Sequence, residues 1–313
     1  MICMIIRGIH YGLTLLYSYL LPLFKIEETH GGFTFTIDLG PFKELKCRFN
    51  EFTLETTCST DPGFMEIHIE RILGLEKHSL FKDLCKWINV EKCIVDQVSL
   101  IYDPAYKNIV AYSVYLSRNT NYYINTLKWV REAIEMGVVD STSFIPREFN
   151  RVKREIDHVL STGLDPISEA LSLMKIRGFG VKSANAYLLH AYGLTQYAPI
   201  DRHYTRLLNT LKPTSKATCL HKGKLQCSIC SVDCPYRIAH STLGEFNGVV
   251  QSLVYIHARL SSLHKSQLEK ILVADYEYYR DIFENLLHRV KEEIFIELGA
   301  IGETKWSRMG GEI

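Results

Sequence analysis

The sequence predicts an α+β protein in which an N-terminal antiparallel β domain precedes a mostly α-helical body with a four-cysteine metal loop. Three observations predict it: apolar and polar residues alternate over residues 31–70, the period lengthens to that of helices after about residue 78, and four cysteines cluster within 219–234. With 313 residues, 47% of them hydrophobic, the chain can bury a sizeable core. We therefore expect four parts: a β-rich domain over 1–78, a helical core over 79–218, a metal loop over 219–234 and C-terminal helices packing on the core over 235–313.

The first 24 residues are apolar but contain Arg7, His10 and Pro22. No small-residue cleavage pattern follows them, so a signal peptide is not expected. The stretch after Arg7 is marginal in length for crossing a bilayer, which leaves a membrane anchor as an alternative. We expect a buried N-terminal element and no membrane partner.

The β domain is predicted from short runs rich in aromatic, Thr and Ile residues. The clearest is Phe33-Thr34-Phe35-Thr36-Ile37, and further runs occur at 46–49, 52–57 and 64–69. Together they predict a small antiparallel sheet.

Helix start signals appear next along the chain. Asp103 and Asp165 each precede a proline, an arrangement that places a capping carboxylate before proline at the first helical position. Residues 246–260 are expected to be helical. Apolar residues at three- and four-residue spacing over 267–298 predict one long helix or two abutting ones.

A glycine turn at Gly178 and Gly180 separates two stretches expected to be helical, 167–175 and 184–192. Glycines let the backbone approach a ligand closely, and the N–H groups at the start of the second helix, from Val181 onward, can bind a phosphate. On its own, such a turn is also compatible with a plain connection between helices.

Nineteen residues after Lys182, Asp201 precedes another helical run. Taken separately, Asp201 is explained as a helix N-cap and Lys182 as a surface lysine. The pairing of the two with the glycine turn favours a shared function.

The segment 176–206 resembles the active-site stretch of the endonuclease III and 8-oxoguanine DNA glycosylase superfamily, which has a helix-hairpin-helix core. The resemblance implies that Lys182 is the nucleophile and Asp201 the catalytic carboxylate. It is close over 165–210 and loose over 30–210. The family usually has Leu-Pro before the first hairpin glycine, where this chain has Ile176-Arg177, and this departure predicts a less rigid turn.

The implied chemistry explains these residue types. A glycosylase breaks the bond between base and sugar, and a nearby carboxylate stabilises the positive charge that develops on the sugar. A neutral lysine amine can then attack the sugar carbon and form a Schiff base, which permits strand cleavage, the AP lyase activity. Burial of Lys182 would keep its amine neutral.

The resemblance implies two further DNA contacts. Asn119 falls on the position of a polar amide that fills the space left by the extruded nucleotide. His203 falls on a position that approaches the phosphate backbone. A surface-loop asparagine and a structural histidine are the alternatives.

The N-terminal β domain indicates the substrate, because 8-oxoguanine and alkylbase glycosylases have such a domain and endonuclease III does not. We therefore expect removal of 8-oxoguanine. Ala186 stands where 8-oxoguanine glycosylases commonly have cysteine, so an oxidised pyrimidine, uracil or an alkylated base remains an alternative. A non-catalytic helix-hairpin-helix DNA-binding protein is the alternative from another class.

Cys219, Cys227, Cys230 and Cys234 offer four thiolates, which fit tetrahedral zinc or an iron–sulfur cluster. The loop resembles the iron–sulfur loop of endonuclease III, which favours [4Fe–4S]. Its last spacing is shorter than in that family, and it lies before the helical residues 246–260 rather than at the C-terminus. Structural zinc therefore stays open, and an electron-transfer module is disfavoured because one cluster explains little of the chain.

The net charge of +1 does not by itself indicate a polyanionic partner. However, residues 147–237 contain 14 Lys or Arg against 7 Asp or Glu, so the basic excess coincides with the motifs. This distribution is typical of a solvated basic face or of a DNA-binding surface. We expect double-stranded DNA containing a damaged base as partner, a monomeric protein and an intracellular location.

Overall fold

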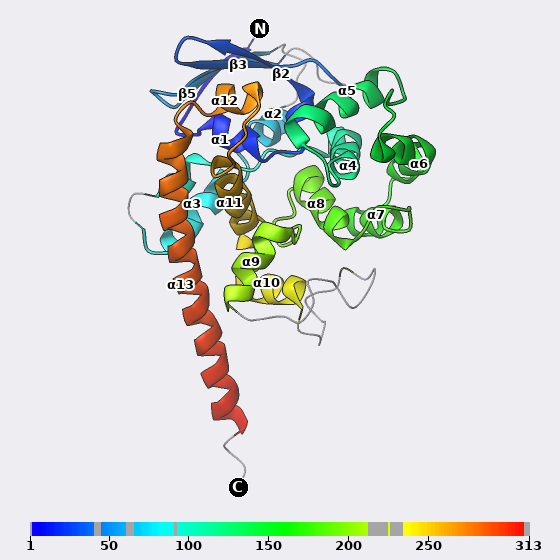
Figure 1. Ribbon diagram of the computed structural model, residues 1–313. Coiled ribbons are helices and arrows are strands. Elements are labelled where there is room, and N and C mark those ends of the chain that lie inside the picture. Colours follow the sequence, from blue (N-terminus) through cyan, green and yellow to red (C-terminus); the bar gives the residue numbers. More distant parts are fainter. Residues whose placement is uncertain are drawn as a thin grey trace.

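The computed structural model describes residues 2–40, 45–60, 66–90, 93–211 and 234–309, together with Leu225. A five-stranded antiparallel sheet forms one end of the molecule, and helices form the rest (Figure 1). This arrangement agrees with the predicted α+β class. The division into four parts stays a prediction.

The sheet has the strand order β1-β5-β4-β3-β2, with every neighbouring pair antiparallel. Its strands are β1 (Ile2–Arg7), β2 (Phe24–Thr29), β3 (Gly32–Ile37), β4 (Lys46–Asn50) and β5 (Glu55–Thr60). In β3 the aromatic and Ile side chains are buried and the threonines between them are not, as the alternation predicts. Cys47 and Cys58, directly opposite in β4 and β5, form a disulfide.

One predicted β run is wrong. Residues 64–69 were expected to be a strand, but the chain forms the helix α2 (Glu66–Ile72) from residue 66. Its buried residues are Ile69 and Ile72, three positions apart, which is helical spacing. The alternation of Ile67 and Ile69 is misleading because Ile67 is exposed.

The N-terminal segment is a buried element, as expected, only after the edge strand β1, in which Cys3, Ile5 and Arg7 are exposed. After β1, every residue of helix α1 (Tyr11–Leu16) is buried, and so is the short turn η1 (Leu21–Leu23). Within the described ranges, no helix combines the length and the apolar character needed to cross a membrane.

The predicted helix starts are confirmed. The Asp103 carboxylate accepts a hydrogen bond from the Ala105 N–H, and Asp165 accepts from the N–H groups of Ile167 and Ser168. The remaining helical elements are α3 (His78–Trp87), η2 (Ile94–Gln97), η3 (Pro104–Tyr106), α4 (Lys107–Leu116), η4 (Tyr122–Thr126), α5 (Leu127–Glu135), α6 (Phe144–Ser161), α7 (Pro166–Leu173), α8 (Val181–Tyr192), α9 (Arg202–Leu211), α10 (Pro235–Leu243), α11 (Phe246–Leu260), α12 (Gln267–Leu272) and α13 (Tyr276–Met309).

Helix α11 occupies the middle of the helical body. It packs against α1, α3, α9, α10 and α13 (Figure 1). The predicted apolar pattern over 267–298 forms two helices, the short α12 and the long α13, whose far end extends away from the body in Figure 1. As a result, segments distant in sequence meet around α11.

Candidate active site

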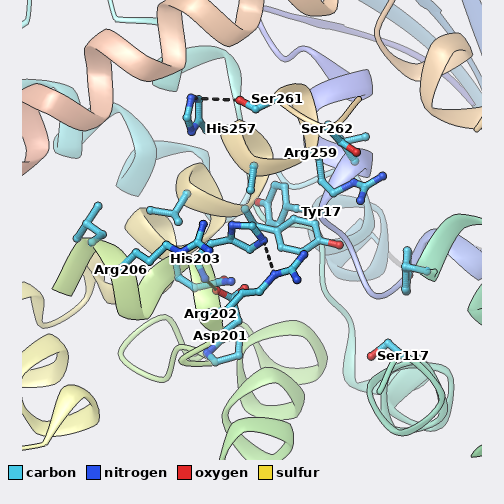
Figure 2. A pocket seen from close by; sticks show the side chains of 18 of the residues that line it. Tyr17, Ser117, Asp201, Arg202, His203, Arg206, His257, Arg259, Ser261 and Ser262 are labelled. Atoms are coloured by element: carbon cyan, nitrogen blue, oxygen red, sulfur yellow. Dashed lines mark hydrogen bonds between the residues drawn. The ribbon is translucent and has the colours of Figure 1, made fainter. Parts of the chain in front are cut away.

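A cavity of about 1300 Å³ lies where these segments meet (Figure 2). Its walls come from α1 and the loop after it, the loop after α4, the N-terminal ends of α8 and α9, and one side of α11 and α13. Of the residues singled out in the sequence, Asn119, Lys182, Asp201 and His203 line it. The hairpin residues Gly178, Gly180 and Val181 are not part of its wall.

Lys182 and Asp201 face the same cavity from the ends of two successive helices. Lys182 is the second residue of α8, and Asp201 immediately precedes α9. The Lys182 side chain is exposed, so the expectation that the protein itself buries this amine is wrong. Two helix starts opening on one cavity bring the two groups to the same surface.

Asp201 is also the N-cap of α9. Its Oδ1 accepts hydrogen bonds from the backbone N–H groups of His203 and Tyr204, both at 2.8 Å. Because both bonds use Oδ1, the cap leaves Oδ2 for another interaction. One carboxylate can therefore cap α9 and also act in the cavity. Burial is the main cause that raises the pKa of the Tyr19 phenol, and the negative charge of Asp201 also raises it.

The glycine turn is held by buried side chains. Gly178 has φ +87°, and its carbonyl accepts a hydrogen bond from Arg118 Nη1 at 3.1 Å. Arg118 also donates to Glu148, which is buried and forms an ion pair with Arg177. The Tyr115 hydroxyl donates to the Arg177 carbonyl at 3.1 Å. These contacts hold the turn, while the lower rigidity expected from the missing Leu-Pro stays a prediction.

The N-terminus of α8 leaves donors free for a ligand. Gly180 is its N-cap and supplies no side chain, and the first helical bond runs from the Ala184 N–H to the Gly180 carbonyl at 2.9 Å. The N–H groups of Val181, Lys182 and Ser183, which precede Ala184, thus form no hydrogen bond within the helix. Such donors, with the positive end of the helix dipole, suit a phosphate.

Asn119 and His203 line the cavity from two different elements, the loop after α4 and helix α9. Asn119 is exposed, with φ +51°, in the loop after α4. His203 is partly buried and accepts a hydrogen bond from Arg202 Nε at 3.0 Å, the dashed line beside Asp201 in Figure 2. Burial lowers the pKa of His203, and the nearby Asp201 opposes this effect. His203 is therefore mainly an uncharged hydrogen-bonding group at neutral pH.

The cavity wall is basic. The side chains of Lys182, Arg202, Arg206, Arg259 and Lys291 line it, against two carboxylates, Asp201 and Glu284. Figure 2 shows Arg202 and Arg206 close to Asp201, with Arg259 on the other side of Tyr17. A polyanion is the ligand that such a wall attracts.

Several lining residues were not found from the sequence. The cavity is lined by three buried residues, Tyr17, His190 and Gln251. It is also lined by two partly buried tyrosines, Tyr19 and Tyr255. Gln251 was detectable in principle, because it is an amide within the apolar helix α11. The two tyrosines of the N-terminal segment carried no such signal.

The metal loop lies largely outside the described residues. Cys219, Cys227 and Cys230 belong to the part of the chain about which nothing is described here, whereas Cys234 is a buried free cysteine at the N-cap of α10. No group of three potential metal ligands occurs among the described residues. The cluster stays a prediction.

The sheet, the helical body and the hairpin together form the fold of the helix-hairpin-helix DNA glycosylases. Solved structures with this fold include the Clostridium acetobutylicum 8-oxoguanine glycosylase/lyase, bound to double-stranded DNA with cytosine opposite 8-oxoG (TM-score 0.56, 11% identity, covering 81% of this chain and 93% of that one) and in its apo form (TM-score 0.52, 11% identity, 81% and 95%). MBOgg1 with a low-affinity DNA ligand is also similar (TM-score 0.54, 15% identity, 81% and 94%). No family model and no curated protein matches the sequence.

Proposed function

We propose that this protein is a DNA glycosylase with AP lyase activity that removes a damaged base, 8-oxoguanine, from double-stranded DNA. The observation that supports it most is the placement of one amine, Lys182, and one carboxylate, Asp201, at helix starts that open on a single basic cavity. A protein that only binds phosphate needs the glycine turn and the basic cavity wall, but it does not need a carboxylate at the position of Asp201.

DNA binding is the first step of the proposal. The N–H groups from Val181 onward bind a backbone phosphate, and Arg202 and Arg206 of the cavity wall neutralise others, whereas Arg259 is paired with the buried Glu269. Because Nε2 of His203 accepts a hydrogen bond from Arg202, its neutral ring carries the proton on Nδ1, which donates to a phosphate oxygen of the backbone. Asn119, exposed on its loop, fills the space in the duplex that the extruded nucleotide leaves.

Base removal and strand cleavage follow at the sugar. The base leaves with the electrons of its glycosidic bond, and the Asp201 carboxylate stabilises the positive charge on the sugar. The Lys182 nitrogen forms a bond to C1′ and its proton passes to the departing base anion; the C1′–O4′ bond then breaks as O4′ takes up a proton, and the opened sugar is held as a Schiff base. Loss of a proton from C2′ then expels the 3′ phosphate and cleaves the strand.

The state of the Lys182 amine is set by its surroundings during the reaction. Its side chain is exposed, so the protein alone does not desolvate it. DNA lying over the cavity mouth excludes water from the amine. Catalysis is thus coupled to correct placement of the DNA.

The choice of 8-oxoguanine is supported by the fold and by the cavity. Two of the similar structures are 8-oxoguanine glycosylase/lyases by their names. The Gln251 amide, buried in the wall, offers a donor and an acceptor to a base edge, and the Tyr255 ring offers a face for stacking. Neither residue by itself excludes an oxidised pyrimidine, uracil or an alkylated base.

The test is covalent trapping with borohydride on duplexes that contain 8-oxoguanine, an oxidised pyrimidine, uracil or an alkylated base. The wild-type protein is expected to be trapped on the 8-oxoguanine duplex, and Lys182→Gln is expected not to be. Lys175→Gln is the matched control, an exposed lysine just before the hairpin that does not line the cavity. Trapping that survives in Lys182→Gln identifies another nucleophile.

We also propose that the loop cysteines hold a [4Fe–4S] cluster with a structural role, structural zinc being the alternative. Cys234 suits a ligand position in that it is buried, free of disulfides and placed where α10 begins. A cluster there ties α10 to the preceding segment.

A further inference from the structure

His190 is a buried titratable residue that the mechanism above does not use. It lies on α8, two turns beyond Lys182, and its side chain is part of the cavity wall. The residue is 2% exposed, and its Nδ1 has no hydrogen-bond partner among the described residues. Buried polar atoms without a partner are rare and call for an explanation.

The surroundings of His190 are aromatic and uncharged. Its ring meets the Tyr19 ring edge-on, with centroids 4.9 Å apart, and lies 6.0 Å from the Tyr17 ring. Tyr19 in turn packs edge-on against Tyr122. Burial lowers the pKa of His190 to about 3, so its imidazole is neutral under ordinary conditions.

A purely structural histidine in the same protein is arranged differently. His10 is also fully buried, and its Nε2, 3.4 Å from Glu51 Oε1, likewise has no hydrogen-bond partner among the described residues; its Nδ1, however, accepts a hydrogen bond from the Leu13 N–H at 3.2 Å. His10 caps α1 and does not line the cavity. His190 has no comparable hydrogen bond to a described residue, yet it faces a cavity.

The proposed function gives this arrangement a purpose. A neutral imidazole presents one donor and one acceptor, and it does so without a charge that would attract phosphate. The two tyrosines beside it provide apolar surface that suits a planar ring. An everted base entering this part of the cavity meets a hydrogen-bonding group inside an aromatic wall.

Resting on the proposed function, we propose that His190 is a specificity-determining residue that hydrogen-bonds a polar ring or exocyclic atom of the everted base. It acts on the base and not on the sugar. A duplex whose target nucleotide has already lost its base does not use this contact.

The experiment compares two substrates that differ only in the base. One duplex contains 8-oxoguanine, and the other contains an abasic site at the same position. Single-turnover base release is measured on the first and strand cleavage on the second, for the wild type, His190→Met and His190→Gln. Met has a similar volume without a hydrogen-bonding ring nitrogen, whereas Gln keeps a donor and an acceptor.

We expect His190→Met to slow base release by about 5- to 100-fold, the range for a buried hydrogen-bonding partner that is lost. Cleavage of the abasic duplex is expected to stay within about two-fold, and His190→Gln to recover part of base release. Equal rates of base release in the wild type and His190→Met would overturn the inference, and so would equal losses on both substrates.

Failure of the proposed function gives a different result. A wild-type protein that neither releases a base from any damaged duplex nor cleaves the abasic duplex would refute both the function and the role of His190. An active wild type with an unaffected His190→Met refutes the role of His190 alone. Should His190→Met fail to fold, His190→Gln and His190→Asn are compared instead, and unequal losses on the two substrates are still required.

Discussion

Lys182 and Asp201 stand at the starts of α8 and α9, and both side chains line one cavity although they are nineteen residues apart. The turn before α8 and the loop before α9 bring both helix N-termini to the same surface. The positive ends of both helix dipoles therefore lie at this cavity. In the proposed mechanism both helices favour the phosphate, and stabilisation of the sugar cation depends on the Asp201 carboxylate.

The double role of Asp201 gives the first prediction. Asp201→Asn keeps an oxygen that can cap α9, so its free energy of unfolding should change by less than about 1 kcal/mol. Asp201→Ala loses the cap as well and should cost about 1 kcal/mol more. Both variants should slow base release by about 100-fold or more, because the charge opposite the sugar is gone.

Asp165→Asn is the matched control for this prediction. Asp165 caps α7 through the N–H groups of Ile167 and Ser168 and does not line the cavity. Its replacement should leave base release unchanged. Denaturant unfolding and single-turnover kinetics of the three variants separate the two roles, and an Asp201→Asn protein with normal base release would reduce Asp201 to a cap.

The hydrogen bonds of Arg118 to the Gly178 carbonyl and to Glu148 give a second prediction. A Cβ at Gly178 would lie 2.0 Å from Arg118 Nη1, and the residue has φ +87°. Gly178→Ala therefore forces Arg118 away from the Gly178 carbonyl and from Glu148, besides straining the backbone. We expect a loss of stability of about 2 kcal/mol or more and weaker binding to duplex DNA of any sequence.

Gly163→Ala is the control for backbone strain alone. Gly163 has φ +69°, and an added Cβ there meets nothing within 4 Å. It should cost about 1 kcal/mol and leave DNA affinity unaltered. DNA affinity is measured by fluorescence anisotropy. Equal changes of affinity in Gly178→Ala and Gly163→Ala would show that the Arg118 hydrogen bonds do not matter for the turn.

The sequence predicts those parts of the fold and site that local patterns determine. Asp103 and Asp165 mark helix starts because capping is a local hydrogen bond. Lys182 and Asp201 are recognisable because one short segment contains both. Residues 66–69 were assigned wrongly because tertiary packing, not local alternation, decides that Ile67 is exposed and Ile69 buried.

The rest of the cavity could not be derived from local patterns. Tyr17 and Tyr19 follow α1, whereas Gln251 and Tyr255 belong to α11, and only the packing of α1 on α11 brings them together. His190 reads as one more residue of a buried helix. That its Nδ1 has no hydrogen-bond partner among the described residues becomes visible only when the neighbours of its ring are known.

The cysteine loop gives a third prediction. The purified protein should be brown, with broad absorbance near 400 nm, and should contain about four irons per chain if the cluster is [4Fe–4S]. Cys234→Ser should lower the iron content and destabilise the segment around α10, whereas Cys3→Ser, at an exposed free cysteine in the sheet, should change neither. A colourless protein with one zinc per chain would replace the iron assignment by zinc.

The buried neutral state of His190 gives a final prediction about stability and pH. In the unfolded chain a histidine titrates near pH 6.5, whereas burial in the folded protein lowers the pKa of His190 to about 3. Between these values the unfolded state binds a proton that the folded state does not, so the contribution of His190 is fully present above about pH 6.5 and is lost as the pH falls toward 3. The free energy of unfolding should therefore decrease by about 1.4 kcal/mol per pH unit from this residue alone.

In His190→Met this component disappears, while the carboxylates titrate as before. Denaturant unfolding of both proteins at pH 7, 6, 5 and 4 should show the wild type losing stability relative to the variant as the pH is lowered: the two curves converge and then cross if the variant is less stable at pH 7, and diverge if it is more stable. Parallel curves would mean that the folded protein accommodates a charged imidazole at this position, and the neutral hydrogen-bonding role of His190 would then be wrong as well.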